Sequence, residues 1–553
     1  MNTVPNPPSI RPATLAAVYF LLALVFQAET LLIPPRQDSA AWLFMAERQT
    51  HGEMPGRDLW DNKLPLIYLI GRAAHATGHS QVFLWLVEAG MTAAGALAVC
   101  GMAMRPAGRR AASIAGALLC VVSGVPTFHA GGYMTEIYAM PLSAVATWLT
   151  YTAAVRRRGT ARALAAGLAW TIAVSFRLPL AVVAVVVVGY AAVTAARNRP
   201  ADQRKATRID TFVRFVMAQS AGAMAGIAIV LAHPVFAGYL PDCVAAAVAW
   251  PLGIGGGRIA GPATLAAAQR LSEWAQDLLK LGWLHIAAIA GLLVAGSGAV
   301  SCHAWNGGTS EHSSHALLEE THRRDADAPH PARHDATPAP SFIVMVTLWY
   351  TAALGSAALG WTSHAHYQYV ALAPMCLAIS LTATCITTPV SLRFAIVFLI
   401  VSSLAVGAMD ARLLWRRLPD RRDADRTALI DYVHHHTRPD ETVLVWAWSG
   451  TADLLYRLDR PPGTRHFMAH GYFNMDMRLF EEFALAFLAD PPDWIVEDRQ
   501  FSRPALATPT AGRRPATPVD LIRLRKFARR GYRQTATFGR YVVFRLGPTS
   551  RRP

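Results

Sequence analysis

The chain has 553 residues, of which 53% are hydrophobic and only 16% are charged, whereas soluble domains usually carry about 25% charged residues. This composition excludes an ordinary soluble protein and favours a membrane protein. The net charge of +16 does not indicate nucleic-acid binding, because the basic residues lie between apolar runs and in the tail. The six cysteines mostly lie in apolar runs without CxxC spacing, so we interpret them as packing residues.

Eleven apolar segments approach the roughly 20 residues that cross a bilayer. They lie near residues 13–33, 82–104, 111–128, 136–155, 163–176, 178–196, 215–233, 281–300, 341–359, 368–386 and 391–409. The first is long enough to remain as a span rather than a cleaved signal peptide. Arg177 separates the fifth and sixth runs. We interpret these two runs as a helical hairpin with Arg177 at its tip, and one long kinked helix is the alternative.

Charge predicts the topology. Three arginine-rich connections fall on the cytoplasmic side if the N-terminus is inside, as the positive-inside rule requires; they are 105–110, 156–162 and 197–214. Four acidic and aromatic connections then face outward: 34–81, 129–135, 234–280 and 360–367. The cytoplasmic connection 301–340 carries six histidines among Ser, Asp, Ala and Pro, and it is typical of a disordered linker. Metal buffering is the weaker interpretation, because the histidines have no fixed spacing.

The tail is polar and mixed. Three segments are predicted as a strand, a second strand and a hairpin, namely 442–446, 493–496 and 532–546. An amphipathic basic helix is predicted over 521–529. We therefore expect a mainly α polytopic membrane protein of about eleven helices. Its membrane domain spans residues 1–409, and a small α/β domain outside the membrane spans 410–553.

The first outer connection, residues 34–81, concentrates charged and aromatic side chains. Charged groups beside a bilayer are costly unless they serve a function there, so we expect chemistry in this connection. Two short helices are predicted within it, over 39–49 and 64–76. Asp38 precedes the first helix, where a helix cap is the ordinary interpretation. The functional interpretation is a carboxylate that takes a proton from an incoming hydroxyl.

The same connection contains a charged run that ends at Lys63. Lys63 lies just ahead of the second predicted helix, where its ammonium suits a contact to a lipid phosphate. A lysine that snorkels beside an aspartate is the alternative. Three neighbours are further candidates for donor binding: Arg57, Asp58 and Asp61.

Other outer connections add candidates. Glu136 opens the fourth span, where the helix dipole favours an anion, and capping is again the alternative. Arg177 and Arg258 place cations on the same face. Two histidines and a tyrosine between the ninth and tenth spans either bind a phosphate or metal or simply lie at the interface; they are His364, His366 and Tyr367.

Three motifs in this order resemble the GT-C superfamily of integral-membrane glycosyltransferases. Within it, the chain looks closest to the bacterial protein-mannosyltransferase and aminoarabinose-transferase group of family 39 type. The motifs are RDxWDxKxPL at residues 57–66, Thr135–Leu142 at the fourth span, and His366–Tyr369 with Pro374 further on. The resemblance covers about residues 10–400 and extends more loosely into the tail.

The resemblance implies roles for individual residues. Asp38 corresponds to the catalytic acid of the first loop, Glu136 to the second acidic site, and Lys63 to the contact with the lipid phosphate. Many relatives carry a second acid directly after the first, where this chain has Ser39. A divalent metal ion, if one is used, would therefore need Glu136 or His366 beside Asp38.

The implied function is sugar transfer from a polyprenyl-phosphate-linked donor to an envelope glycolipid, glycan or protein. The expected place is the periplasmic face of the bacterial inner membrane, among membrane lipids and without nucleic acid. A transporter or lipid flippase is the alternative; it would need an internal repeat with broken helices, and no convincing repeat is evident. A third hypothesis is a non-catalytic scaffold of envelope-polymer synthesis, in which the outer acids are dispensable.

Overall fold

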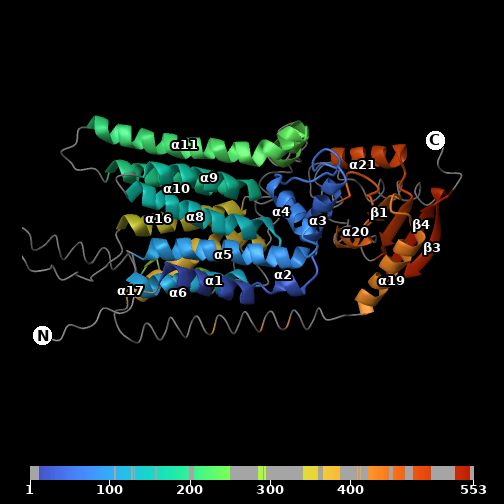
Figure 1. Ribbon diagram of the computed structural model, residues 1–553, viewed down its shortest axis with the longest axis horizontal. Coiled ribbons are helices and arrows are strands. Elements are labelled where there is room, and N and C mark those ends of the chain that lie inside the picture. The colour runs from blue at the N-terminus through green and yellow to red at the C-terminus, as the bar shows by residue number, and fades with distance from the viewer. Residues whose placement is uncertain are drawn as a thin grey trace, which may run out of the picture.

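The computed structural model describes residues 11–35, 37–104, 108–125, 129, 131–155, 159–197, 205–249, 284–290, 292–293, 340–358, 365–385, 401, 408, 412, 421–446, 452–467, 477–499 and 530–547. A bundle of long helices forms one end of the molecule, and a small sheet with its helices forms the other (Figure 1). Two short helices of the first outer connection lie between these two parts (Figure 1).

The bundle consists of apolar helices that run side by side. They are α1 (Pro12–Phe26), α5 (Ser80–Ala103), α6 (Gly108–Ser123), α8 (Thr135–Val155), α9 (Thr160–Phe176), α10 (Leu180–Arg197), α11 (Lys205–Phe236), α16 (Pro340–Ala358) and α17 (Leu372–Cys385). Within the described part, three helices are long and apolar enough to cross a membrane, and four more are apolar but shorter. The chain is thus a multi-pass membrane protein.

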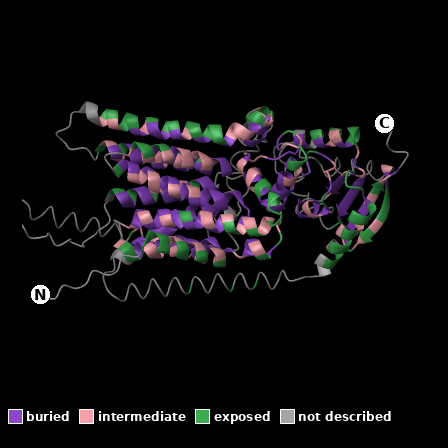
Figure 2. Ribbon diagram, in the orientation of Figure 1, coloured by how far each residue is buried: buried purple, intermediate pink, exposed green. Residues whose placement is uncertain are grey.

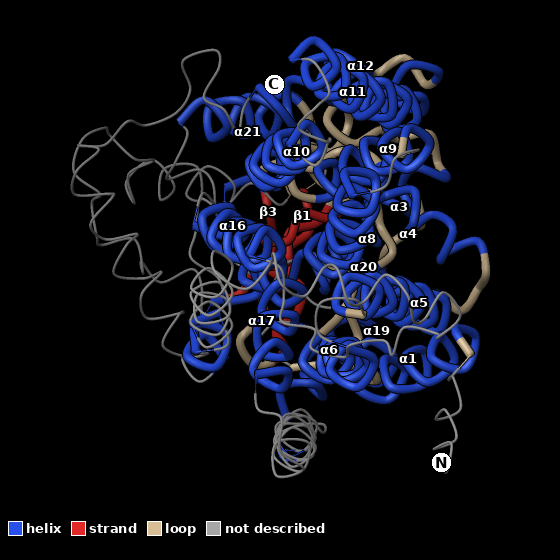
Figure 3. The backbone as a smooth tube through the Cα atoms, turned by 90° about the vertical axis from the view of Figure 1, so that its left-hand side faces the viewer, coloured by secondary structure: helices blue, strands red, loops and turns tan. Residues whose placement is uncertain are grey.

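Burial follows from this arrangement. In Figure 3 the bundle is seen end-on with α8 near its centre, and α8 packs against α5, α9 and α10. Many residues along α11 are exposed (Figure 2), and the apolar ones among them include Phe236, which is 90% exposed. Small residues bring α9 and α11 together, since a Cβ at Gly167 or Gly222 would collide with the backbone of the facing helix.

The first predicted span is broken. α1 ends at Phe26, and a separate short helix α2 (Glu29–Leu32) follows. The buried Gln27 amide donates to Thr92 Oγ1 at 2.8 Å and to Ser123 Oγ at 3.1 Å. Polar groups within a membrane require partners inside the protein, so the chain turns at Gln27 to provide them.

Most other spans agree with their predicted segments within a few residues. α9 and α10 both run along α8 and α11, so the hairpin interpretation is confirmed and one kinked helix is wrong. α11 begins at Lys205, ten residues before the predicted 215. A 3₁₀ helix over Ala365–Ala371 precedes α17. The span near 281–300 is described only in part, and most of 391–409 lies outside the described residues.

The first outer connection forms α3 (Gln37–Thr50) and α4 (Leu66–Ala76), which confirms both predicted helices. α3 begins before Asp38, so Asp38 lies in the first helical turn and not ahead of it as predicted. The carboxylate still complements the positive end of the helix dipole there. α12 (Leu240–Val244) and a π-helical turn (Ala245–Ala249) follow α11.

The C-terminal domain contains one four-stranded sheet in the order β1-β2-β4-β3. Its elements are α19 (Arg421–His436), β1 (Val443–Trp446), α20 (Ala452–Leu458), α21 (Met477–Ala489), β2 (Trp494–Asp498), β3 (Tyr532–Phe538) and β4 (Tyr541–Leu546). β1 and β2 are parallel and are connected through α20 and α21, whereas β4 is antiparallel to both β2 and β3. The predicted strands and hairpin are confirmed, and the predicted helix 521–529 lies outside the described residues.

The first outer connection packs into this domain. The Trp60 side chain, 4% exposed, belongs to a core cluster with Leu444 and Phe483 of the C-terminal domain. Its backbone N–H donates to the Arg465 carbonyl at 2.7 Å. On α3, Phe44 contacts Phe467 edge to face at 5.1 Å between ring centroids. The C-terminal domain therefore fixes the position of the connection that carries the charged motif.

Candidate active site

The first part of the site lies on α3. Asp38 is exposed in the first turn, and Trp42 follows one turn later at 2% exposure. Residues four apart share one side of a helix, so Asp38 lies above the turn that carries Trp42. Ser39, between them, is buried at 1% exposure and points into the protein.

Asp61 connects α3 to the charged motif. Its Oδ2 accepts hydrogen bonds from Trp42 Nε1 at 2.9 Å and from the Tyr68 hydroxyl at 2.6 Å. Its Oδ1 accepts the backbone N–H of Asn62 at 2.7 Å. The carboxylate is buried, and these three donors satisfy it. Asp61 thus fixes the motif against α3 and α4.

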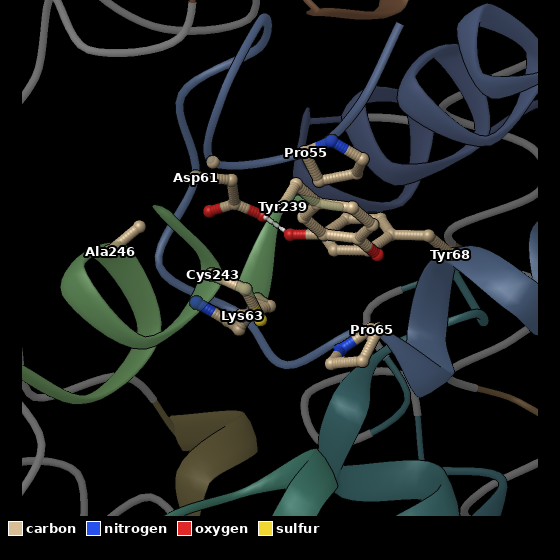
Figure 4. A pocket seen from close by; sticks show the side chains of 9 residues that line it. Pro55, Asp61, Lys63, Pro65, Tyr68, Tyr239, Cys243 and Ala246 are labelled. Atoms are coloured by element: carbon tan, nitrogen blue, oxygen red, sulfur yellow. Dashed lines mark hydrogen bonds between the residues drawn. The ribbon is translucent and has the colours of Figure 1, made fainter. Parts of the chain in front are cut away.

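Lys63 lies beside this network. Its Nζ donates to Asn62 Oδ1 at 2.5 Å and lies 5.7 Å from the Trp42 ring centroid, within cation–π range. A narrow, partly open pocket lies beside Lys63 (Figure 4). Its lining includes Asp61, Lys63, Pro65, Tyr68, Tyr239 and Cys243.

Arg57 and Asp58 do not line the pocket. They form an exposed ion pair with 2.8 Å between Arg57 Nη2 and Asp58 Oδ2. Asp58 also accepts the Met54 backbone N–H at 2.8 Å. Burial opposes ionisation of Asp58, but hydrogen bonds from Arg57 and the Met54 amide outweigh it and hold its pKa below the usual value. The pair therefore stabilises the turn before Trp60.

The second part of the site joins three distant segments. Arg177 Nη1, from the turn between α9 and α10, lies 2.5 Å from Glu136 Oε1 in the first turn of α8. The Thr135 hydroxyl donates to the other Glu136 oxygen at 3.0 Å. The guanidinium carbon of Arg177 lies 4.1 Å from the Tyr367 ring centroid. Among the described residues, no group accepts a hydrogen bond from the buried Nε or Nη2 of Arg177.

A short loop connects the two parts. The Ser39 hydroxyl donates to the Gly132 carbonyl at 2.7 Å, which ties the start of α3 to the residues before α8. Trp42 and Tyr133 make an edge-to-face contact at 6.2 Å between ring centroids. Tyr133 in turn contacts Tyr138 at 6.2 Å, and Tyr138 stacks on Phe176 next to Arg177. Contiguous contacts therefore run from the pocket to the Glu136–Arg177 pair.

This geometry gives a physical reason for Ser39 at a position where the resemblance implies a second acid. A carboxylate has no proton to donate, so Asp at position 39 would face the Gly132 carbonyl without a hydrogen bond. The loop cannot yield easily, because Gly132 has φ +85° and lies against the Thr30 side chain.

We expect Ser39→Asp to destabilise the protein by about 1–3 kcal/mol, the cost of a buried polar group left without its partner. Ser39→Ala, which removes one hydrogen bond without adding a charge, is the control and should cost less. Thermal unfolding in detergent measures both. An Asp variant as stable as wild type would contradict this account of position 39.

Of the three predicted metal ligands, Asp38 and Glu136 lie among the described residues, and the side chain of His366 does not. Glu136 is engaged by Arg177 and Thr135, and Ser39 by a backbone carbonyl. In the part of the chain that the structure describes, no three His, Cys, Asp or Glu side chains group as metal ligands. Arg258 and His364 lie outside the described residues, as does the side chain of His366.

Residues that the sequence analysis did not select also occupy this region. Glu29 and Glu88 are buried carboxylates within apolar segments, and His129 lies between them. An ionisable residue inside a membrane segment is itself a functional signal, and this signal was available from the sequence for both glutamates. The roles of Trp42 and Tyr68 had no such signal, because both look like ordinary interfacial aromatic residues.

Sequence comparison gives no assignment: no family model and no curated protein matches the chain. Solved structures do match. One is ArnT from Cupriavidus metallidurans bound to undecaprenyl phosphate, at 13% identity and a TM-score of 0.53, covering 98% of this chain and 99% of that one. Another is the oligosaccharyltransferase of Archaeoglobus fulgidus in the apo form, at 12% identity and a TM-score of 0.51, covering 97% and 74%. The expected resemblance is thus confirmed at the level of the fold: the chain shares its fold with both of these proteins.

Proposed function

We propose that the protein transfers a sugar from a polyprenyl-phosphate-linked donor to an envelope glycolipid, glycan or protein. The observation that carries this proposal is the shared fold with ArnT over almost the whole of both chains, in a structure of ArnT that holds undecaprenyl phosphate. Asp38, Lys63 and the Glu136–Arg177 pair lie at the end of the bundle next to the C-terminal domain. By the positive-inside rule, the arginine-rich connections of the bundle support a periplasmic position for that end.

The chemistry requires two groups on opposite sides of the sugar. The bond between the anomeric carbon and the phosphate oxygen breaks, and cations stabilise the departing phosphate. Lys63 supplies a cation beside the pocket, and Arg177 supplies a second. The acceptor oxygen or nitrogen forms the new bond as its proton passes to a base, and the exposed carboxylate of Asp38 is our candidate.

The direct test is transfer by the purified protein in proteoliposomes that contain a lipid-linked sugar. Glycolipids and glycoproteins from a strain without the protein, measured by mass spectrometry, identify the substrates. We expect one sugar unit to be missing from one acceptor while its lipid-linked precursor accumulates. If the precursor instead fails to cross the bilayer and transfer continues with precursor supplied outside, the protein is a flippase and the proposal is wrong.

Lys63→Ala separates donor from acceptor recognition. We expect the KM for the lipid-linked donor to rise about tenfold or more, because a hydrogen bond to a charged group contributes about 1.5–3 kcal/mol. The KM for the acceptor should stay nearly constant. Arg48→Ala is the control, since Arg48 is a cation of the same connection that pairs with Glu53 away from the pocket. Equal changes in both KM values would contradict the donor-phosphate role.

A further inference from the structure

A buried cluster of ionisable residues lies beside the candidate site, and the proposed mechanism does not use it. His129, in the connection between α6 and α8, lies between two carboxylates. Its Nδ1 is 3.6 Å from Glu29 Oε2, and its Nε2 is 3.5 Å from Glu88 Oε2. Glu88 and His129 are both 0% exposed. Isolated charges at such depth are costly, so they persist only when paired and hydrogen-bonded.

Glu88 holds the loop that joins the two parts of the candidate site. Its Oε1 accepts the backbone N–H of Tyr133 at 2.5 Å and the hydroxyl of Tyr138 at 3.2 Å. Its Oε2 accepts the hydroxyl of Thr30 at 2.7 Å. Tyr133 has φ +52°, a conformation that is uncommon outside glycine and needs support from its surroundings. The bond to Glu88 provides that support.

The loop 131–134 contacts the start of α3 on one side and leads into α8 on the other. The Gly132 carbonyl, one residue before Tyr133, accepts the Ser39 hydroxyl next to Asp38. Two residues after Tyr133, α8 begins, and Glu136 lies in its first turn. The backbone between Gly132 and Glu136 therefore sets the positions of both candidate acids relative to one another.

We propose that Glu88 is a positioning residue for glycosyl transfer, which holds the loop 131–134 through an ion pair with His129. This inference rests on the proposed function for its kinetic readout, but the contacts that it invokes do not. Five titratable groups face His129 or its carboxylate partners: Glu29, Glu88, Tyr133, Tyr138 and Tyr369.

The charge of His129 makes this support dependent on pH. Burial lowers the pKa of His129, but pairing with Glu29 and Glu88 outweighs burial and raises the pKa from 6.5 to about 9. The stabilisation that these ion pairs contribute is therefore fully present below pH 6.5 and is lost as the pH rises through about 9. The loop should be held at neutral pH and released in alkaline solution.

The test compares Glu88→Gln with wild type in two measurements. The amide oxygen can still accept the Tyr133 N–H, but the variant lacks the charge that pairs with His129. We expect kcat to fall about tenfold with little change in the donor KM. The alkaline limb of the pH profile should move at least one pH unit lower. A shift of one unit corresponds to about 1.36 kcal/mol of lost pairing. At pH 7, hydrogen exchange should show lower protection of the Tyr133 amide relative to the rest of α8.

Glu53→Gln is the matched control, because it removes a carboxylate from the outer connection that pairs with Arg48 and does not contact the loop. Wild-type kcat, pH profile and loop protection in Glu88→Gln would overturn the proposal.

If that variant does not fold, His129→Gln carries the test: its alkaline limb should disappear, and an unchanged limb would overturn the proposal. If wild type transfers no sugar but its loop loses protection in Glu88→Gln, the proposed function fails while the structural support stands.

Discussion

Asp38→Asn should lower sugar transfer by about 100- to 10,000-fold, the usual contribution of a positioned general base. The amide keeps the size and polarity of the carboxylate but cannot take the proton of the acceptor. Asp38 is exposed in the first turn of α3, so the substitution should leave the fold and its melting temperature nearly unchanged. Transfer is measured with saturating donor, and binding of undecaprenyl phosphate to the purified protein is measured alongside it.

The comparison of binding with transfer makes this result specific. Donor binding should persist in Asp38→Asn, because the cationic pocket around Lys63 is intact. Glu47→Gln is a suitable control, since Glu47 is a carboxylate of the same helix that faces Asp459 of the C-terminal domain. Transfer at the wild-type rate in the Asn variant would refute the assignment of Asp38. Loss of binding together with transfer would instead place Asp38 in donor recognition.

Much of the fold was predictable from the sequence because membrane spans and strands have strong local signals. Apolar runs located most helices of the bundle, and alternation with turn residues located the strands of the C-terminal sheet. The errors occurred where tertiary contacts decide the local structure. Gln27 ends α1 inside an apolar run because its amide reaches Thr92 and Ser123, residues that are distant in sequence.

The sequence identified the individual residues of the candidate site, but not which of them contact one another. Glu136, Arg177 and Tyr367 each stood out as a polar group at a membrane edge, and nothing in the sequence linked them. Their contacts depend on the packing of α8, the α9–α10 turn and the 3₁₀ helix before α17. Asp61 looked like a donor-binding residue, whereas its carboxylate is occupied by Trp42, Tyr68 and the Asn62 amide.

The buried ion pair between Glu136 and Arg177 leads to the second large prediction. Arg177→Met should destabilise the protein by about 3–5 kcal/mol, because it leaves a buried carboxylate without its cation. The double variant Glu136→Gln with Arg177→Met removes both charges and should recover most of that loss, since replacing a whole buried pair by neutral groups is often nearly neutral. Thermal unfolding in detergent measures both variants against wild type.

Sugar transfer by these variants then shows whether the Glu136–Arg177 ion pair serves only stability or also function. Two buried nitrogens of Arg177, Nε and Nη2, make no hydrogen bond to any described residue, although Arg177 already pairs with Glu136 and stacks on Tyr367. A cation that served stability alone would be expected to have its donors satisfied, because a buried unsatisfied donor costs about 1–3 kcal/mol. We propose that those donors bind the phosphate of the lipid-linked sugar. The stable double variant should therefore transfer sugar poorly and require more donor, and full transfer at the wild-type donor KM would show that the pair is structural only.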